Sequence, residues 1–300
     1  YSGDHMQGVY LGGVWFPDKT RVGWWKNGYP KYFGKMINAV NFMKLIIKVN
    51  GEQLDLNKQT PKDFNLDLDL KSGILKRSFK VEIGELQFTF ERFVSVVQKE
   101  LVGQRVTVKN LSNSNVNVEI TSMIDADVYN EDSNHDEQFW DVLSKKADGA
   151  HAEVMSKTKP NDFGVPQFTV GMKTTTVTDL KHIEDGTSDK TAYNVFAGEI
   201  KPNSEINFEK RTVVATSRDF DTEDEIEQRL DELAAKLDAE SFDALLKPHE
   251  EEWHNRWTKS DVVINGDEEA QQGIRFNLFQ LFSTYYGQDY RLNIGPKGFT

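Results

Sequence analysis

The sequence predicts a mainly β protein in which a large antiparallel β-sandwich precedes a helical segment. From about residue 40 to residue 216 apolar and polar side chains alternate, a period of two that is typical of strands with one buried face. Turn-forming residues interrupt the alternation at short intervals, and no helical pattern separates the runs. After residue 220 apolar residues recur every three or four positions, which indicates helices.

The strand pattern is clearest in four runs between residues 64 and 120. These runs are residues 64–70 (FNLDLDL), 86–93 (LQFTFERF), 106–108 (VTV) and 116–120 (VNVEI). Residues suited to turns precede, separate or follow them, at positions 50–51, 72–73, 84, 110–115, 160–164 and 202–203. Turns at this spacing give roughly a dozen strands, as in a large sandwich.

Two helices are expected directly after the last strand. Thr222 and Glu225 supply a capping box at the start of the first. Its apolar stripe consists of Ile226, Leu230, Leu233 and Leu237. The second helix begins at Ser241 and continues past Pro248, which bends or restarts it. The continuation carries two tryptophans on one face, Trp253 and Trp257.

A third helix is expected after a short extended stretch, residues 261–266. It begins near Glu268, carries bulky apolar side chains and ends near Gly287. The chain therefore divides into a sandwich domain at residues 1–220, a helical linker at 221–262 and the beginning of a helical domain at 263–300. Because residue 1 is not Met and the last ten residues form a loop with glycine and proline, we expect both ends to be cuts within a longer protein.

Composition excludes several classes of function. The 300 residues carry a formal net charge of -12 at pH 7, from 36 Lys and Arg against 48 Asp and Glu. Such a field repels nucleic-acid phosphates and anionic lipid surfaces, so we expect neither nucleic acid nor a membrane as a partner. The lack of cysteine excludes disulfides and thiolate metal sites. No apolar run approaches the roughly 20 residues that span a bilayer, and the first residues do not have the order of a signal peptide.

The segment from His249 to His254 (HEEEWH) looks at first sight like the zinc-binding helix of a metalloprotease. That chemistry needs two histidines four residues apart on one helix face, with Glu beside the first. These two are five residues apart, about 140° around a helix, so a charged linker helix is the better interpretation. The other histidines are scattered through the sandwich, and no metal cluster follows from their spacing.

Residues 125–132 (DADVYNED) contain four acidic side chains. Carboxylates at this density suit a calcium site or a catalytic pair, but the run lacks the glycine and the final glutamate of an EF-hand loop. We therefore interpret it as a solvated loop at the end of a strand.

Residues 15–34 combine aromatic side chains with glycines and follow neither a helical nor a strand period. Aromatic rings stack on the C–H faces of sugars while polar neighbours bind hydroxyl groups, so this stretch suits a carbohydrate site. Packing of the rings on the sandwich or on another domain is the alternative. The residues of interest, as a wall of a site or as a domain or dimer contact, are Trp24, Trp25 and Tyr29.

A second unusual stretch covers residues 273–300. Its helix carries arginine, asparagine and glutamine, including Gln280, among bulky apolar residues, and the loop after it contains Arg291. Further along, Lys297 stands next to Gly298 in a Gly-Pro-Lys-Gly sequence. A lysine flanked in this way can approach an anionic ligand closely, because glycine adds no side chain.

These two stretches resemble the disaccharide phosphorylases of glycoside hydrolase family 65, above all those that act on maltose. Residues 12–42 look like the aromatic N-terminal segment of that family, and residues 272–300 look like the start of its catalytic barrel. Shorter similarities occur in the same order at residues 125–127 (DAD), 139–142 (FWDV), 256–257 (RW) and 260–263 (SDVV). The resemblance implies a large N-terminal super-sandwich, a helical linker, an (α/α)6 barrel that would open at residue 263, and a small C-terminal β domain.

The resemblance also implies a reaction. Phosphorylases of this kind cleave an α-glucosidic disaccharide with inversion, and maltose yields β-glucose 1-phosphate and glucose. One carboxylic acid protonates the glycosidic oxygen while inorganic phosphate attacks the anomeric carbon from the opposite face. Phosphate is then a co-substrate, and no metal or organic cofactor is implied. The catalytic acid of the family lies in the barrel beyond Thr300, so we assign no catalytic residue to this chain.

The resemblance places the loop from Arg291 to Thr300 at the approach to the glucose pocket. We therefore expect four residues to lie near bound substrate: Lys297, Gly298, Arg291 and Gln280. A cytoplasmic homodimer is implied as well. The alternatives are a phosphorylase of kojibiose, nigerose or trehalose, a non-catalytic carbohydrate-binding sandwich, or a scaffold that only positions the missing catalytic barrel.

Overall fold

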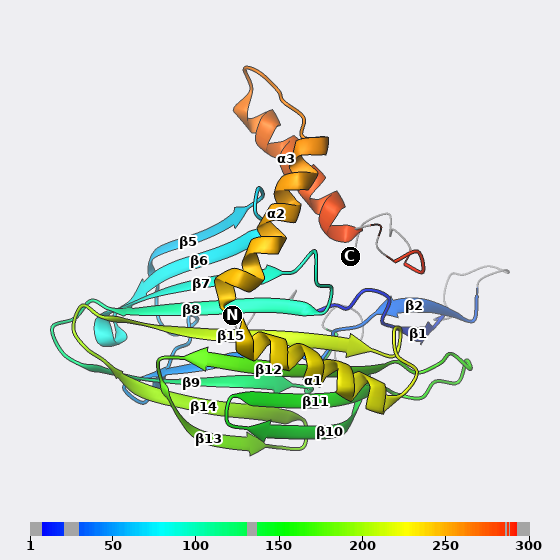
Figure 1. Ribbon diagram of the computed structural model, residues 1–300, viewed down its shortest axis with the longest axis horizontal. Helices are drawn as coiled ribbons and strands as arrows, with labels where there is room; N and C mark the ends of the chain where they lie inside the picture. The colour runs from blue at the N-terminus through cyan, green and yellow to red at the C-terminus, as the bar shows by residue number, and fades with distance from the viewer. Residues whose placement is uncertain (1–7, 21–29, 131–136, 286, 288, 293–300) are drawn as a thin grey trace.

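The structure is a two-layered β-sandwich from which a pair of helices projects (Figure 1). It is a computed structural model that describes residues 8–20, 30–130, 137–285, 287 and 289–292. An eight-stranded sheet forms one layer and a five-stranded sheet forms the other, and neighbouring strands in both are antiparallel. The expected fold class, a large antiparallel sandwich followed by helices, is confirmed.

The larger sheet has an irregular strand at each edge. Its strands follow in the order β10 (Trp140–Asp148), β11 (His151–Thr158), β12 (Thr169–Thr178), β15 (Glu205–Thr216), β8 (Leu101–Asn110), β7 (Leu86–Val94), β6 (Ile74–Val81) and β5 (Lys62–Asp69). The pairing register shifts between Val142 and Ser144 in β10 and between Lys62 and Asn65 in β5. Such bulges bend a strand and increase its twist.

The smaller sheet covers one face of the larger. Its order is β13 (Lys181–Thr187), β14 (Thr191–Ile200), β9 (Val116–Asp125), β3 (Leu45–Val49) and β4 (Glu52–Gln53). A separate hairpin consists of β1 (Trp15–Lys19) and β2 (Tyr32–Met36), and a 3-10 turn, η1 (Ile83–Glu85), precedes β7. The described residues form 15 strands, somewhat more than the dozen or so expected. The strands of the hairpin and the two-residue β4 are too short for alternation to reveal them.

Two apolar clusters fill the space between the sheets. Met172 of the larger sheet and Ile124 of the smaller belong to one cluster, while Phe208 and Ile120 belong to the other. The period-two pattern explains both clusters, since successive side chains of a strand point to opposite faces. Every second residue of each strand is therefore available to the core.

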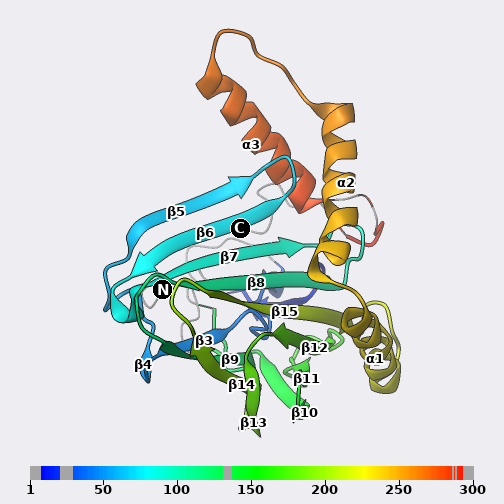
Figure 2. The ribbon, with the colours of Figure 1, turned by 60° about the vertical axis from the view of Figure 1, so that its left-hand side comes forward.

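Helix α1 (Glu223–Ala239) lies across the outer face of the larger sheet (Figures 1 and 2). The predicted capping box is present: the Thr222 hydroxyl accepts from the Glu225 N–H at 3.2 Å, and the Glu225 carboxylate accepts from the Thr222 N–H at 3.0 Å. All four residues of the predicted stripe are buried. Gly171 of β12 permits the close approach, since an added Cβ would lie 2.7 Å from side-chain carbons of Ile226 and Leu230.

Helix α2 (Phe242–Ser260) rises from the larger sheet, and α3 (Glu268–Thr284) runs back beside it (Figure 2). The hydroxyl of Ser241 caps α2 by accepting from a backbone N–H, and Pro248 lies within the continuous helix, as expected. Residues 261–266 connect the two helices without forming a strand. Helix α3 ends at Thr284 rather than near Gly287, because Tyr285 already has an extended backbone, with φ -146° and ψ 120°.

Candidate functional site

Helix α2 is fastened to the turn between β5 and β6, which we call the anchor turn (residues 70–73). The indole Nε1 of Trp257 donates a 2.7 Å hydrogen bond to the carbonyl of Leu70, and Nε2 of His249 lies 3.3 Å from the carbonyl of Gly73. The φ angle of Gly73 is 69°, and a Cβ at this position would lie 2.2 Å from Nε1 of Trp253. Glycine suits both the left-handed backbone and the close contact.

His249 is buried, with its ring against that of Phe93. Its Nδ1 accepts a 3.3 Å hydrogen bond from the Val96 N–H, so the bond from Nε2 to the Gly73 carbonyl assigns the neutral tautomer with the proton on Nε2. Burial lowers the pKa of His249 below its ordinary 6.5, and the backbone around Gly73 only partly opposes this. The HEEEWH segment therefore holds one buried, uncharged histidine and one exposed histidine, His254, on different faces.

Helix α3 packs on α2 through aromatic rings. The rings of Trp253 and Phe279 are stacked, with centroids 4.6 Å apart and planes 18° apart. Trp257 meets Phe282 edge to face at 5.8 Å. Such pairs contribute roughly 0.5–1.5 kcal/mol each beyond the area they bury. The anchor turn, α2 and α3 are thus joined in series, and we call α2, α3 and their connection the helical arm (residues 242–284).

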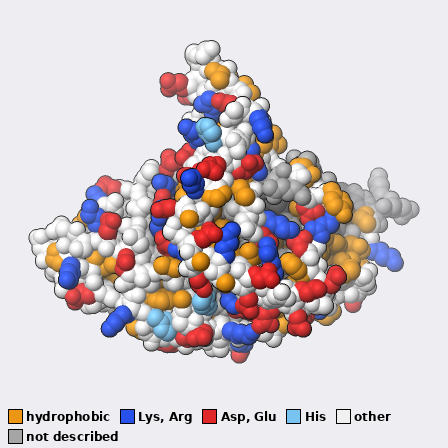
Figure 3. All heavy atoms as spheres, viewed as in Figure 1, with side chains coloured by type: hydrophobic (Ala, Val, Ile, Leu, Met, Phe, Trp, Pro, Cys, Tyr) orange, Lys and Arg blue, Asp and Glu red, His pale blue; other side chains and the backbone are white. Residues whose placement is uncertain are grey.

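Several apolar side chains of the helical arm lie at its surface. Phe276 and Leu281 flank the packed stripe of α3 and are 46% and 63% exposed, and in the connection Val262 and Val263 are 43% and 68% exposed. Exposed apolar residues grouped on one projecting element are typical of an interaction surface. The sandwich face below the arm shows acidic, basic and apolar side chains interspersed (Figure 3).

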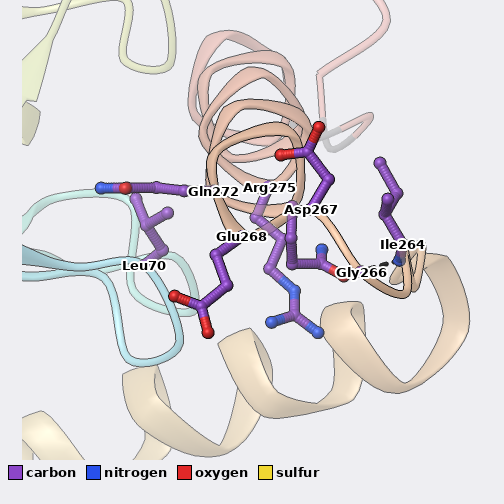
Figure 4. A pocket seen from close by; sticks show the side chains of 8 residues that line it. Leu70, Ile264, Gly266, Asp267, Glu268, Gln272 and Arg275 are labelled. Carbon is purple, nitrogen blue, oxygen red and sulfur yellow. Dashed lines mark hydrogen bonds between the residues drawn. The ribbon is translucent and has the colours of Figure 1, made fainter.

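A cavity of about 310 Å³ lies between the start of α3 and Leu70 of the anchor turn (Figure 4). Three of the polar side chains around it, those of Asp267, Gln271 and Arg275, have partners within the chain. Arg275 donates to both carboxylate oxygens of Asp261 at 2.8 and 2.7 Å, and Gln271 bonds to the Val262 carbonyl and to the Ile264 N–H. We therefore interpret the cavity as part of the packing between the helical arm and the anchor turn.

The segment after α3 returns to the sandwich at a cluster of charges that we call the C-terminal ion network. Nη2 of Arg291 lies 2.6 Å from a carboxylate oxygen of Asp219 and 2.6 Å from one of Asp289, and Nη1 donates to the Arg218 carbonyl. Asp219 also accepts from Lys99 at 2.8 Å. All three guanidinium nitrogens of Arg291 donate to protein acceptors, because Nε bonds to Asp289 as well.

Electrostatics keep the C-terminal ion network charged. Burial disfavours the carboxylate of Asp219, yet hydrogen bonds from Lys99 and Arg291 hold its pKa below the ordinary 3.8. Hydrogen bonds from the side chain and backbone of Arg291 lower the pKa of Asp289, and pairing with the two carboxylates raises the pKa of Arg291. The segment is thus docked by fixed charges over the whole neutral range.

The C-terminal ion network brings together the two stretches that the sequence singled out. Nη1 of Arg218 donates a 3.1 Å hydrogen bond to the carbonyl of Gly13, just before the aromatic stretch begins at Trp15. Leu292 lies beside Gly12, 3.6 Å from the position of an added Cβ. Two segments almost 280 residues apart therefore meet at the end of β15.

The predicted site residues have different places. Arg291 lies in the C-terminal ion network, while Gln280 is exposed on α3, where its backbone carbonyl accepts from a threonine hydroxyl. Trp15 stacks on Tyr32 at 6.3 Å, so this part of the aromatic stretch packs within the protein. Five residues lie outside the described part of the chain: Trp24, Trp25, Tyr29, Lys297 and Gly298. A role for any of them at substrate stays a prediction.

Of the acidic run 125–132, the two acids at the end of β9 and just after it pair with lysines, while Glu131 and Asp132 lie outside the described residues. Asp125 is buried and pairs with Lys44 at 2.5 Å, while Asp127 pairs with Lys190 at 2.8 Å. The first carboxylate is therefore a loop anchor rather than a solvated group. Among the described residues no three His, Asp or Glu side chains are grouped in a way that could hold a metal ion.

Sequence reasoning missed His249 as an anchor and Asp219 as a docking group. Both lie in segments rich in charge, where no local pattern separates a paired carboxylate or a buried imidazole from a solvated one. A usable signal existed for His249, because it precedes Trp253 by four residues and so shares the apolar face of α2.

Comparisons with known proteins identify relatives over the whole chain. The maltose phosphorylase of Bacillus subtilis (strain 168) is 45% identical over 303 residues, which cover 100% of this chain and 39% of that protein. The α,α-trehalose phosphorylase of Thermoanaerobacter brockii is 26% identical over 313 residues, with the same coverage of 100% and 39%. A solved structure assigned as a kojibiose phosphorylase from the human microbiome has the same fold, with a TM-score of 0.87, 23% identity and coverage of 100% and 39%.

The chain thus spans 39% of the length of these relatives. In the part of the chain that the structure describes, no helix is long and apolar enough to cross a membrane. The family described as glycosyl hydrolase family 65, N-terminal domain, matches residues 1–256, which is most of the sequence. The chain therefore belongs to glycosyl hydrolase family 65.

Proposed function

We propose that this chain is the N-terminal part of a disaccharide phosphorylase that converts maltose and inorganic phosphate into β-glucose 1-phosphate and glucose with inversion. The observation that carries the proposal is the 45% identity to a maltose phosphorylase over the full 300 residues. The relatives named for trehalose, kojibiose and nigerose are 21–28% identical. Maltose is therefore the substrate best supported.

In this reaction an acid of the enzyme protonates the oxygen between the two glucose units while phosphate attacks the anomeric carbon from the opposite face. The anomeric configuration inverts because there is a single displacement. We assign no residue of this chain as the acid, and we propose that the reaction proceeds without a metal or an organic cofactor.

For the chain itself we propose the role of a scaffold that seats a catalytic domain. Two features support it: the helical arm, whose exposed apolar side chains suit a protein partner, and the C-terminal ion network, which fixes the segment leading out of α3. Gln280 lies on the helical arm and Arg291 lies in the C-terminal ion network. We therefore keep their expected nearness to substrate as part of the same proposal.

The intact protein tests the reaction. Purified enzyme is incubated with maltose in the presence and absence of phosphate, and glucose and β-glucose 1-phosphate are measured separately. Equal amounts of both products, formed only with phosphate, are expected. Glucose released equally well without phosphate would identify a hydrolase instead. Parallel assays with trehalose, kojibiose and nigerose decide the substrate.

Calorimetry of residues 1–300 with maltose and phosphate tests the scaffold role. No heat of binding is expected, whereas dissociation constants in the millimolar range or below would identify a carbohydrate-binding sandwich. We further propose that the intact enzyme is a cytoplasmic homodimer. Sedimentation of the intact protein and fractionation of its host cells check these two points.

A further inference from the structure

Polar side chains divide the interior of the sandwich into its two apolar clusters. On β9, for example, Ser122 lies between Ile120 of one cluster and Ile124 of the other, and all three face inward. Neighbouring strands repeat this arrangement at the same level. We call the resulting group the polar belt: Gln104, Ser122, Thr176, Asn194 and Lys210.

Strand register shows that the belt is continuous. In the larger sheet Lys210 of β15 is paired with Gln104 of β8 on one side and with Thr176 of β12 on the other. In the smaller sheet Ser122 of β9 is paired with Asn194 of β14. Two members of the belt form hydrogen bonds across the interior: Lys210, which is 1% exposed, and Asn194.

Lys210 bonds to the opposite sheet through backbone oxygens. Its Nζ donates to the carbonyl of Met123 at 2.6 Å and to the carbonyl of Lys44 at 3.0 Å. These two bonds use two of the three N–H groups of an ammonium. Burial lowers the pKa of Lys210 well below its ordinary 10.5, and the charged form would have one further N–H for an acceptor within the belt.

The other four members of the belt each have a buried oxygen without a hydrogen-bond partner in the described structure: Gln104 Oε1, Ser122 Oγ, Thr176 Oγ1 and Asn194 Oδ1. The amide orientation of Asn194 is fixed, because its Nδ2 donates to the His151 carbonyl at 3.0 Å and to Asp185 at 2.7 Å. Its Oδ1 therefore needs a donor that the described residues do not supply. Buried polar atoms of this kind are normally satisfied by ordered water.

The chemistry of the belt selects the ligand. The oxygen of Asn194 is an acceptor and requires a proton donor, which a chloride ion in the belt would not provide. A metal ion would lie beside the Lys210 amine without a carboxylate of the belt to bind it. Water donates to the amide oxygens and accepts from the lysine and the hydroxyls, so it meets all of these needs.

We propose that the polar belt is a binding site for internal water, which links the Lys210 amine to the oxygens of Ser122, Thr176 and Asn194 and so ties the two sheets together at one register. A slip of either sheet would place apolar side chains opposite these groups. The belt would then specify how the layers face each other, which two apolar clusters alone do not.

A pair of threonines on β12 tests the proposal. Thr176 has the unpartnered hydroxyl, whereas Thr174, on the same face two residues away, donates to the Ala152 carbonyl at 3.3 Å. Valine matches threonine in shape but has no hydroxyl. If the belt holds water, Thr176→Val removes a partner of that water and shifts the urea midpoint of the 300-residue chain downward. If the belt is dry, the same change removes an unsatisfied oxygen and shifts the midpoint upward or leaves it unchanged.

Thr174→Val is the matched control and lowers the midpoint in either case, because a direct hydrogen bond is lost. A crystal structure of the chain gives the second readout. Electron density for water within hydrogen-bond distance of Asn194 Oδ1 and Ser122 Oγ is expected, and it should weaken in Thr176→Val but not in Thr174→Val. A dry belt, protein donors on these atoms, or an anomalous bromide peak in crystals soaked in bromide would overturn the proposal.

Discussion

Replacement of His249 by Phe asks whether hydrogen bonds or apolar packing alone hold α2 to the sandwich. Phe keeps a ring of similar size against Phe93, but it removes the acceptor for the Val96 N–H and the donor for the Gly73 carbonyl. A buried polar group that loses its partner costs roughly 1–3 kcal/mol. Two such groups, offset in part by burial of a more apolar ring, predict a loss of about 2–4 kcal/mol in the free energy of unfolding.

Urea unfolding of the 300-residue chain, followed by tryptophan fluorescence, measures this loss, because Trp253 and Trp257 report directly on α2. His254→Phe is the matched control: it makes the same chemical change on the exposed face of the same helix, where the effect should stay within about 0.5 kcal/mol. Equal stabilities of the two variants would refute the reasoning. Packing alone would then account for the position of the helical arm.

Three further predictions concern the same framework. Burial holds the folded-state pKa of His249 below 6.5, so as the pH falls the unfolded state binds the proton first. The stability that is present above pH 6.5 is therefore lost as the pH falls. Urea midpoints measured across pH should show this slope, and His249→Phe should flatten it. Gly171→Ala should destabilise by roughly 1–3 kcal/mol, because the new methyl would lie 2.7 Å from carbons of Ile226 and Leu230; an unchanged urea midpoint would contradict the close contact. Arg291→Gln should speed protease cleavage of the segment after α3 at low salt, because the pairs with Asp219 and Asp289 are lost. Added salt should have the same effect on the unmodified chain. Identical cleavage rates of the variant and the unmodified chain at low salt would show that the ion network does not hold the segment.

Local patterns predicted the elements whose own residues determine them. Thr222 and Glu225 form the capping box that their spacing indicates, and the stripe of α1 is buried as its period requires. Alternation also carries a signal for one buried charge. Lys210 has the inward parity of Phe208 and Val214 in β15, so the pattern alone places a lysine in the core. Its acceptors, however, are the carbonyls of Met123 in β9 and of Lys44 just before β3, and no period encodes them.

The candidate site was predictable only in outline. The C-terminal ion network joins Lys99, Asp219 and Arg291, which lie far apart in sequence and meet only after both the sandwich and the helical arm have formed. Each is an ordinary charged residue in its own segment. The anchor turn poses the same difficulty, because Gly73 reads as a plain turn glycine until Trp253 is placed against it.

The irregular edges of the larger sheet bear on how a chain with this much β structure avoids aggregation. An incoming strand at β10 would meet a bulged backbone and the adjacent charges of Lys145 and Lys146. At β5 it would meet another bulge, with Asp67 and Asp69 along the strand. Charges and bulges at sheet edges discourage edge-to-edge pairing. Substitutions that straighten or neutralise β5 or β10 are therefore the changes most prone to turn this sandwich into a template for fibrils.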